Sequence, residues 1–288
     1  MLFDLTMLIF DRQAKGNVKP TRELYTPHGT YGITVDEKAQ EMYLTIQHDS
    51  AVVVFNKYAT KDDAPLRTTQ GEKSRLADPH GIALDAERGL IYVANFGSVH
   101  YHDANLDNKA RPMYSRGKGK ANWPLTRNSI IPGSGRYYPP SINVYAKDAK
   151  GDAVPIRVIE GPKAQLDWPT GIAVDTEKNE LYVTNDMHDE VLVFDATVSG
   201  DAAPKRVIRG PKTLIKNPTG AWVDLKNHEL WVSNFGNYTA SVFPLDANGD
   251  VSPKRTVRSG PSGKRALMIG NPHPVAYDTK HEQILVPN

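Results

Sequence analysis

Two histidines, His80 and His273, each follow a proline and precede an apolar segment of the same type. Imidazole nitrogens are common ligands of divalent metals, and a metal held by histidines can polarise a carbonyl group or lower the pKa of a bound water. His28 lies shortly before another such segment, and Tyr31 occupies the position directly before it. These residues predict a divalent-metal site, zinc or calcium, with Tyr31 as a candidate acid or base.

A second group of distinctive residues lies in a long segment, residues 97–140, that has no clear periodicity. Loops of this length are usually either functional or disordered. His100 and His102 are further candidate metal ligands, because alternate residues of an extended strand point the same way. The segment also interleaves aromatic and basic side chains, and the predicted binding residues are Tyr101, Arg111, Tyr114, Arg116, Trp123, Arg136, Tyr137 and Tyr138.

This combination of rings and cations suits an anionic or macromolecular partner. Aromatic side chains beside arginine and lysine can bind single-stranded nucleic acid, but the sequence contains no nucleic-acid-binding motif. We therefore expect a protein or polysaccharide partner.

Both groups are positioned by a repeat that covers most of the chain. Short apolar segments ending in aspartate recur five times, at residues 32–36, 81–85, 171–175, 220–224 and 274–278. A second apolar segment follows each after a polar turn, at residues 42–45, 91–95, 181–185, 230–234 and 284–288. A third type occupies residues 8–10, 52–55, 142–145, 191–194 and 241–243. Their β-branched and aromatic residues between turn residues predict strands.

A fourth strand type is marked by a proline and, two residues later, an arginine. The arginines are Arg22, Arg67, Arg157, Arg206 and Arg255, and the intervals between successive prolines are 45, 90, 49 and 49 residues. The interval of 90 is one repeat that carries the long segment 97–140. We expect these arginines to lie on outer strands, where charge discourages pairing between sheet edges.

Four antiparallel strands in each unit of roughly 45 to 50 residues are typical of β-propeller blades. We name the strands a to d from the central channel outward. Five strands of each type predict an all-β, single-domain, five-bladed propeller over residues 1–288, with six blades as the alternative. The repeat starts with strands c and d and stops after strand b, so we expect the N-terminal strands to complete the C-terminal blade. The alternative is a swapped oligomer, in which a neighbouring chain supplies these strands.

The topology brings the candidate residues to one face. Residues before strand a and after strand b meet around the mouth of the channel, because the two strands run in opposite directions. The positions before strand a hold Tyr31, His80, Thr170, Thr219 and His273, and four b strands end in asparagine. The insertion lies between strands b and c of its blade and therefore emerges on this face. Polar residues at such positions also serve loops and turns, which is the structural alternative.

The composition excludes several chemistries. The 288 residues contain no cysteine, which removes thiol nucleophiles, disulfides and cysteine-ligated metals. The formal net charge of +2 gives a weak overall field. No apolar run reaches the about 18 residues of a membrane span. Residues 1–10 lack the pattern of a signal peptide, and we expect an extracellular or periplasmic location, with which the absence of cysteine is compatible.

The units Pro169–Asp175, Leu181–Asn185 and Val191–Phe194 resemble the NHL-repeat and YVTN-type β-propellers. The resemblance covers nearly the whole chain outside residues 97–140 and implies a fold rather than a function, because this family includes ligand-binding domains, RNA-binding domains, scaffolds and a few lyases. The Pro-His pairs also resemble those of the peptidyl-α-hydroxyglycine α-amidating lyases, NHL-type propellers whose zinc ligands are histidines before inner strands. His28 is out of register with that motif, and Tyr31 occupies the corresponding place.

The sequence lacks the common catalytic signatures, including a Gly-x-Ser-x-Gly elbow, a glycine-rich phosphate loop and a His-Glu-x-x-His motif. We therefore expect a non-enzymatic recognition or assembly module that binds a macromolecular partner through the insertion-bearing face. The alternative is a divalent-metal-dependent lyase or hydrolase with its site at the channel mouth.

Overall fold

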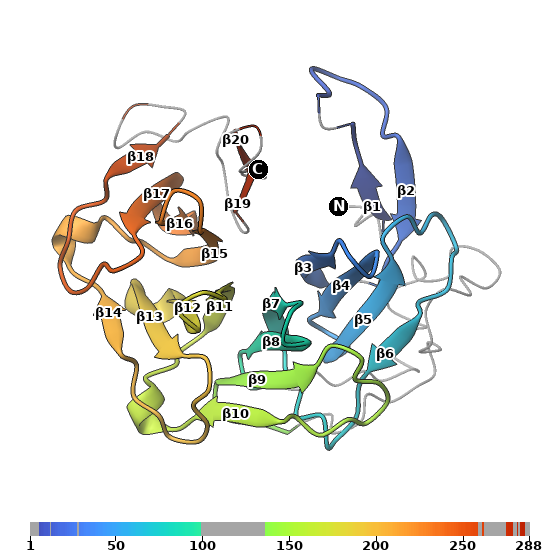
Figure 1. The fold of residues 1–288 in the computed structure, drawn as a ribbon, viewed down its shortest axis with the longest axis horizontal. Helices are drawn as coiled ribbons and strands as arrows, with labels where there is room; N and C mark the ends of the chain where they lie inside the picture. Colours follow the sequence, from blue (N-terminus) through green and yellow to red (C-terminus); the bar gives the residue numbers. More distant parts are fainter. Residues whose placement is uncertain are drawn as a thin grey trace, which may run out of the picture.

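The computed structural model describes residues 6–11, 13–27, 29–98, 136–258, 261, 275–278, 281 and 283–285. Its regular structure is all β apart from short 3-10 turns. Figure 1 shows the sheets arranged side by side around a centre, with β3, β7, β11 and β15 innermost. In the described part of the chain, no helix is long and apolar enough to cross a membrane.

Four sheets have four strands each, hydrogen-bonded antiparallel in chain order from the centre outward. Blade 1 consists of β3 (Thr30–Asp36), β4 (Glu41–Ile46), β5 (Ala51–Asn56) and β6 (Arg67–Thr69). Blade 2 consists of β7 (Pro79–Asp85), β8 (Leu90–Asn95), β9 (Ser141–Ala146) and β10 (Arg157–Glu160). Blade 3 consists of β11 (Pro169–Asp175), β12 (Glu180–Asn185), β13 (Glu190–Asp195) and β14 (Arg206–Ile208). Blade 4 consists of β15 (Pro218–Asp224), β16 (Glu229–Asn234), β17 (Thr239–Pro244) and β18 (Arg255–Val257).

These sheets confirm a propeller of four-stranded antiparallel blades, but the prediction of five or six blades is wrong. Four blades are present in the described residues, together with two separate two-stranded sheets. One contains β1 (Thr6–Ile9) and β2 (Arg22–Tyr25), and the other contains β19 (Ala276–Asp278) and β20 (Gln283–Leu285). The repeat count treated these pairs as halves of one blade. Hydrogen bonding defines a blade, and no strand register joins the two pairs within the described residues.

The aspartate at the end of each strand a stabilises the turn that leads to strand b. The Asp36 carboxylate accepts hydrogen bonds from the backbone N–H groups of Lys38 and Ala39 at 3.0 and 2.9 Å. Asp85, Asp175 and Asp224 accept equivalent bonds in the other blades. The recurring aspartate therefore caps a turn, which satisfies backbone donors that no strand partner reaches.

Glycines in the inner strands allow the blades to approach closely around the channel. A Cβ atom on Gly81 would lie 2.5 Å from the carbonyl oxygen of Thr170, and one on Gly171 would lie 2.6 Å from the Cα of Gly220. Only glycine fits at such separations. Farther out, apolar side chains of strands b and c fill the space between blades, as in the cluster of Tyr92, Val144, Leu181, Leu192 and Phe194 between blades 2 and 3.

The recurring arginines of strand d are bound, which corrects the expectation that they serve as edge charges. Arg206 of β14 donates two hydrogen bonds to the buried Glu180 carboxylate of β12, both at 2.8 Å. It also donates to the carbonyl oxygen of Leu245 in blade 4 at 3.0 Å. The hydrogen bonds that Glu180 accepts from Arg206 and Lys205 lower its pKa to about 2. We call this arrangement the arginine lock.

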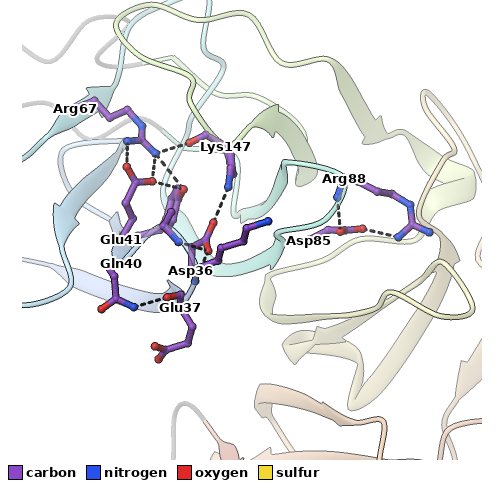
Figure 2. Close-up of polar contacts among 11 residues, drawn as sticks. Asp36, Glu37, Gln40, Glu41, Arg67, Asp85, Arg88 and Lys147 are labelled. Atoms are coloured by element: carbon purple, nitrogen blue, oxygen red, sulfur yellow. Dashed lines mark hydrogen bonds and ion pairs between the residues drawn. The ribbon is translucent and has the colours of Figure 1, made fainter.

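The arginine lock recurs with variations. In blade 1, Arg67 binds Glu41 and the carbonyl oxygen of Lys147, which follows β9 of blade 2, as Figure 2 shows. In blade 4, Arg255 binds Glu229. In blade 2, Leu90 stands where the other blades have glutamate. Arg157 still reaches the next blade, donating to the Ala196 carbonyl oxygen at 2.9 Å. In blades 1, 2 and 3 the arginine therefore joins its blade to the next, with or without the carboxylate.

Candidate functional site

The upper face is defined here as the face where strands a begin and strands b end. Its loops form a continuous hydrogen-bonded chain across blades 3 and 4. The backbone N–H of Asp186 donates to the Trp168 carbonyl oxygen at 3.1 Å. The Asn217 N–H donates to the Asp189 carboxylate at 2.7 Å, and the Phe235 N–H donates to the Asn217 carbonyl oxygen at 3.0 Å.

The asparagines that end the b strands have a structural role on this face. Asn95, Asn185 and Asn234 are fully buried. Their side-chain oxygens accept hydrogen bonds from backbone N–H groups of the loop before strand a, at Ala77, Asp167 and Lys216. They hold the loops in place, so they are not available to a ligand.

Four rings from three blades form a row that begins at the channel mouth. The ring of Tyr31 meets that of His80 edge-on, with centroids 4.2 Å apart. His80 stacks on Phe96 at 3.5 Å, and Phe96 stacks on Trp168 at 5.0 Å. His80 is only 4% exposed, whereas Trp168 is 48% exposed. The ring row is therefore buried at His80 and accessible at its outer end, Trp168.

His80 is oriented by the loop that precedes it. Its Nδ1 atom lies 3.1 Å from the Asp78 carbonyl oxygen and 3.6 Å from an Asp78 carboxylate oxygen. A carbonyl oxygen can only accept a hydrogen bond, so Nδ1 carries the proton. In the neutral ring Nε2 is then the basic nitrogen. Metal-binding histidines are commonly oriented by such a bond to Nδ1.

The other candidate metal ligands cannot be placed beside His80. His28, His100, His102 and His273 lie outside the described residues. Within the described part of the chain, no group of three or more His, Asp or Glu side chains is arranged to hold a metal ion. A catalytic zinc needs about three protein ligands, and of the five candidate ligand histidines only His80 lies in the described residues. The metal site stays a prediction.

Tyr31 lies at the inner end of the ring row. Burial raises the pKa of the Tyr31 phenol, and the negative charge of Asp186 raises it further. The hydroxyl group therefore keeps its proton near neutral pH, which makes it a candidate proton donor or hydrogen-bond donor rather than a base.

The described ends of the insertion lie beside the loop that carries Asp78. The Gly97 N–H donates to the Ala77 carbonyl oxygen at 3.1 Å, and the Ser98 hydroxyl donates to the Asp78 carboxylate at 3.3 Å. The insertion therefore enters the upper face next to His80.

Three predicted binding residues of the insertion fall in its described end. Arg136 forms an ion pair with Glu72, and the Arg75 guanidinium lies 5.6 Å from the Tyr138 ring centre. These contacts anchor the segment, whereas Tyr137 is strongly exposed. Tyr101, Arg111, Tyr114, Arg116 and Trp123 lie outside the described residues.

The channel itself is a cavity of about 250 Å³. Its lining includes Tyr31, Thr170 and Thr219, which precede the strand-a glycines, and apolar residues of the inner strands such as Ile82 and Val174. Hydroxyl groups therefore lie at one end of a mostly apolar channel.

Sequence reasoning missed an apolar patch on the upper face. It consists of Trp168, Met187, Leu214 and Phe235, which are 48%, 54%, 56% and 37% exposed. The signal was the presence of large apolar residues in the loops before strand a and after strand b, where polar residues were expected. We call these four residues the upper patch.

The comparisons with known proteins concern the fold. No protein-family model matches the sequence, and no curated protein is similar to it in sequence. A chain in a crystal structure of a nidogen/laminin complex is similar with a TM-score of 0.58 at 15% identity, over 98% of this chain and 81% of that one.

Two further structures are similar at comparable levels. A chain of hydrazine synthase from Kuenenia stuttgartiensis has a TM-score of 0.54 at 14% identity, over 96% of this chain and 58% of that one. A functionally unknown protein from Desulfotomaculum acetoxidans DSM 771 has a TM-score of 0.57 at 8% identity, over 100% of this chain and 71% of that one. These likenesses support the β-propeller fold, while the closer resemblance to NHL repeats stays a prediction.

Proposed function

We propose that this propeller is a recognition module that binds a protein partner through its upper face. The upper patch carries the proposal. Large exposed apolar side chains gathered on neighbouring loops are typical of interaction surfaces, and Trp, Phe and Met are enriched where proteins meet. The loops that bear the patch are joined by hydrogen bonds from Trp168 to Phe235, so it is presented on a rigid support.

The ring row adds to this rigidity. Trp168 stacks on Phe96, which stacks on the buried His80. Little side-chain freedom is left to lose when a partner covers the indole, which lowers the entropic cost of binding. The similarity to a propeller within a nidogen/laminin complex supports a role in binding in a general way.

Exposed apolar residues also occur on the outer rim, at Leu66, Val154 and Ile156. They lie just before the lock arginines of blades 1 and 2, in two separate segments of the sequence. They provide matched controls, because Ile156 and Leu66 are 55% and 53% exposed, close to Leu214 and Met187.

The test is an affinity capture from an extract of the source cells, with four single variants of equal chemistry. We expect Leu214→Ser and Met187→Ser to lose the captured partner, while Ile156→Ser and Leu66→Ser retain it. Protease treatment of the extract before capture distinguishes a protein from a polysaccharide. Equal capture by all four variants would contradict the proposal.

We retain a second candidate, a divalent-metal lyase or hydrolase, because of the orientation of His80. A bound metal would supply Lewis-acid activation of a carbonyl group or of a water. His80 would offer Nε2 as a ligand, the Asp78 carbonyl oxygen would hold the ring, and Tyr31 would keep a proton available at its hydroxyl oxygen.

Metal analysis by mass spectrometry tests this second candidate. We expect one equivalent of zinc or calcium in the purified protein, lost in His80→Asn and retained in His188→Asn, whose imidazole is half-exposed. Protein that neither carries zinc or calcium when purified nor takes either up when it is supplied would contradict this candidate.

A further inference from the structure

One position of strand a is exposed in blade 1 but buried in the other three blades. Ile82, Ile172 and Ala221 begin the paired part of β7, β11 and β15 and are 6%, 6% and 8% exposed, covered by the inner strands of the preceding blade. Ile33 holds this position in β3 and is 48% exposed. The side of β3 that faces away from blade 2 is therefore uncovered.

The β1–β2 sheet covers only the outer part of that side. Leu24 of β2 and Met7 of β1 pack with Leu44 and Phe55 of blade 1. Leu24 also pairs in parallel with Lys61, as Thr69 pairs with Gly151, Ile159 with Gly200 and Ile208 with Gly249. In the last three pairs, strand d of one blade meets the loop between strands c and d of the next. The β1–β2 sheet thus stands where strands c and d of a blade preceding blade 1 would stand.

The β19–β20 sheet has the complementary character. Ala276 pairs with Leu285, the register that joins Ala83 to Tyr92 and Ala173 to Tyr182 in strands a and b. Val275, directly before β19, is buried against Trp231, Ala240 and Val242 of blade 4. This sheet is therefore an a–b pair seated on blade 4. Figure 1 shows the two sheets beside opposite ends of the run of blades.

We propose that the uncovered side of β3 is an acceptor surface for the β19–β20 sheet of a second copy of this chain. The chain's own β19–β20 sheet rests on blade 4, and no register joins it to β1 within the described residues. The β19–β20 sheet of a second copy is an a–b pair with the same register as the a–b pairs that cover Ile82 and Ile172 in this chain. Exchange of an identical element is a low-cost route to association, and uncovered sheet edges favour it.

The proposal concerns a different surface from the upper patch and is independent of the proposed function. The lack of cysteine in the chain allows a direct test, because Ile33→Cys introduces a single thiol. Its rate of modification by a maleimide is measured at about 1 µM protein and again with about 100 µM wild-type chain added, while light scattering gives the mass in solution. Ile82→Cys is the matched control at the covered position.

We expect the thiol of the Ile33→Cys variant to react with the maleimide about tenfold more slowly when excess wild-type chain is present, for a dissociation constant of about 10 µM. The scattering mass should rise in parallel, and the control should react slowly in both conditions. Protection that is equal at both concentrations would show closure within one chain, and full reactivity at both would show that nothing covers β3. Either result would overturn the proposal.

Discussion

At the outer rim, strand d carries an arginine in every blade, whereas on the upper face the residue before strand a changes from blade to blade. Each rim arginine contacts a carboxylate of its own blade, a carbonyl oxygen of the next blade, or both. The upper positions hold Tyr31, His80, Thr170 and Thr219, and only the first two join the ring row. The position that holds the same residue in every blade therefore stabilises the blades. The position that varies makes the upper face, which a partner would meet, different from blade to blade.

The largest effect should follow from breaking an arginine lock. Arg206→Leu leaves the buried Glu180 carboxylate without its bidentate partner, and we expect a loss of about 3 kcal/mol in the free energy of unfolding. Lys205→Leu removes a half-exposed cation that binds the same carboxylate and should cost less than about 1 kcal/mol. Urea unfolding measures both. Equal losses would show that the rim is not held by the lock.

Acid should weaken the arginine locks at the outer rim. The pKa of Glu180 is lowered from 4.5 to about 2 by hydrogen bonds from Arg206 and Lys205, and the pKa values of Glu41 and Glu229 are also lowered by their arginines. A depressed folded-state pKa contributes stability above the unfolded value, and this stability is lost as the pH falls from about 4.5 towards 2.

For Glu180 the loss should reach about 2–3 kcal/mol. Urea unfolding at a series of pH values should show a shallower acid dependence for Glu180→Gln than for the wild type. An unchanged slope in this variant would contradict the assignment.

A smaller effect is expected from making the upper face uniform. His80→Thr installs the residue type of blades 3 and 4 and removes the stack on Phe96, with an expected loss of about 1–2 kcal/mol in the free energy of unfolding. Thermal unfolding checks this, and Thr219→His is the reverse substitution. A loss as large as that of Arg206→Leu would mean that His80 belongs to the structural framework.

The smallest effect should come from completing the lock in blade 2. Leu90→Glu places a carboxylate at the register position that Glu41, Glu180 and Glu229 occupy, within the reach of Arg157. We expect a gain of no more than about 1 kcal/mol, because leucine packing is lost while an ion pair forms. Destabilisation well beyond this size would show that the blades are less equivalent than the repeat implies.

The repeat made most of the fold predictable, because the strand alternation and the turn aspartates are local features. The blade count was not, since whether β1–β2 joins β19–β20 depends on long-range pairing that periodicity does not encode. His80 was found from its Pro-His pair, and its ring lies against Tyr31, which lines the channel. Phe96 and Trp168 were missed, because their stacking joins loops of different blades, which the period of the repeat does not encode.

The central claim, that the upper patch is the recognition surface, is tested most directly by site-specific photo-crosslinking. A photoreactive phenylalanine analogue replaces Leu214 in one protein and the equally exposed Ile156 in another, and both are irradiated in extract of the source cells. We predict a discrete adduct of higher mass from position 214 and none from position 156. Identical patterns from the two positions, or an adduct at the rim alone, would contradict the claim.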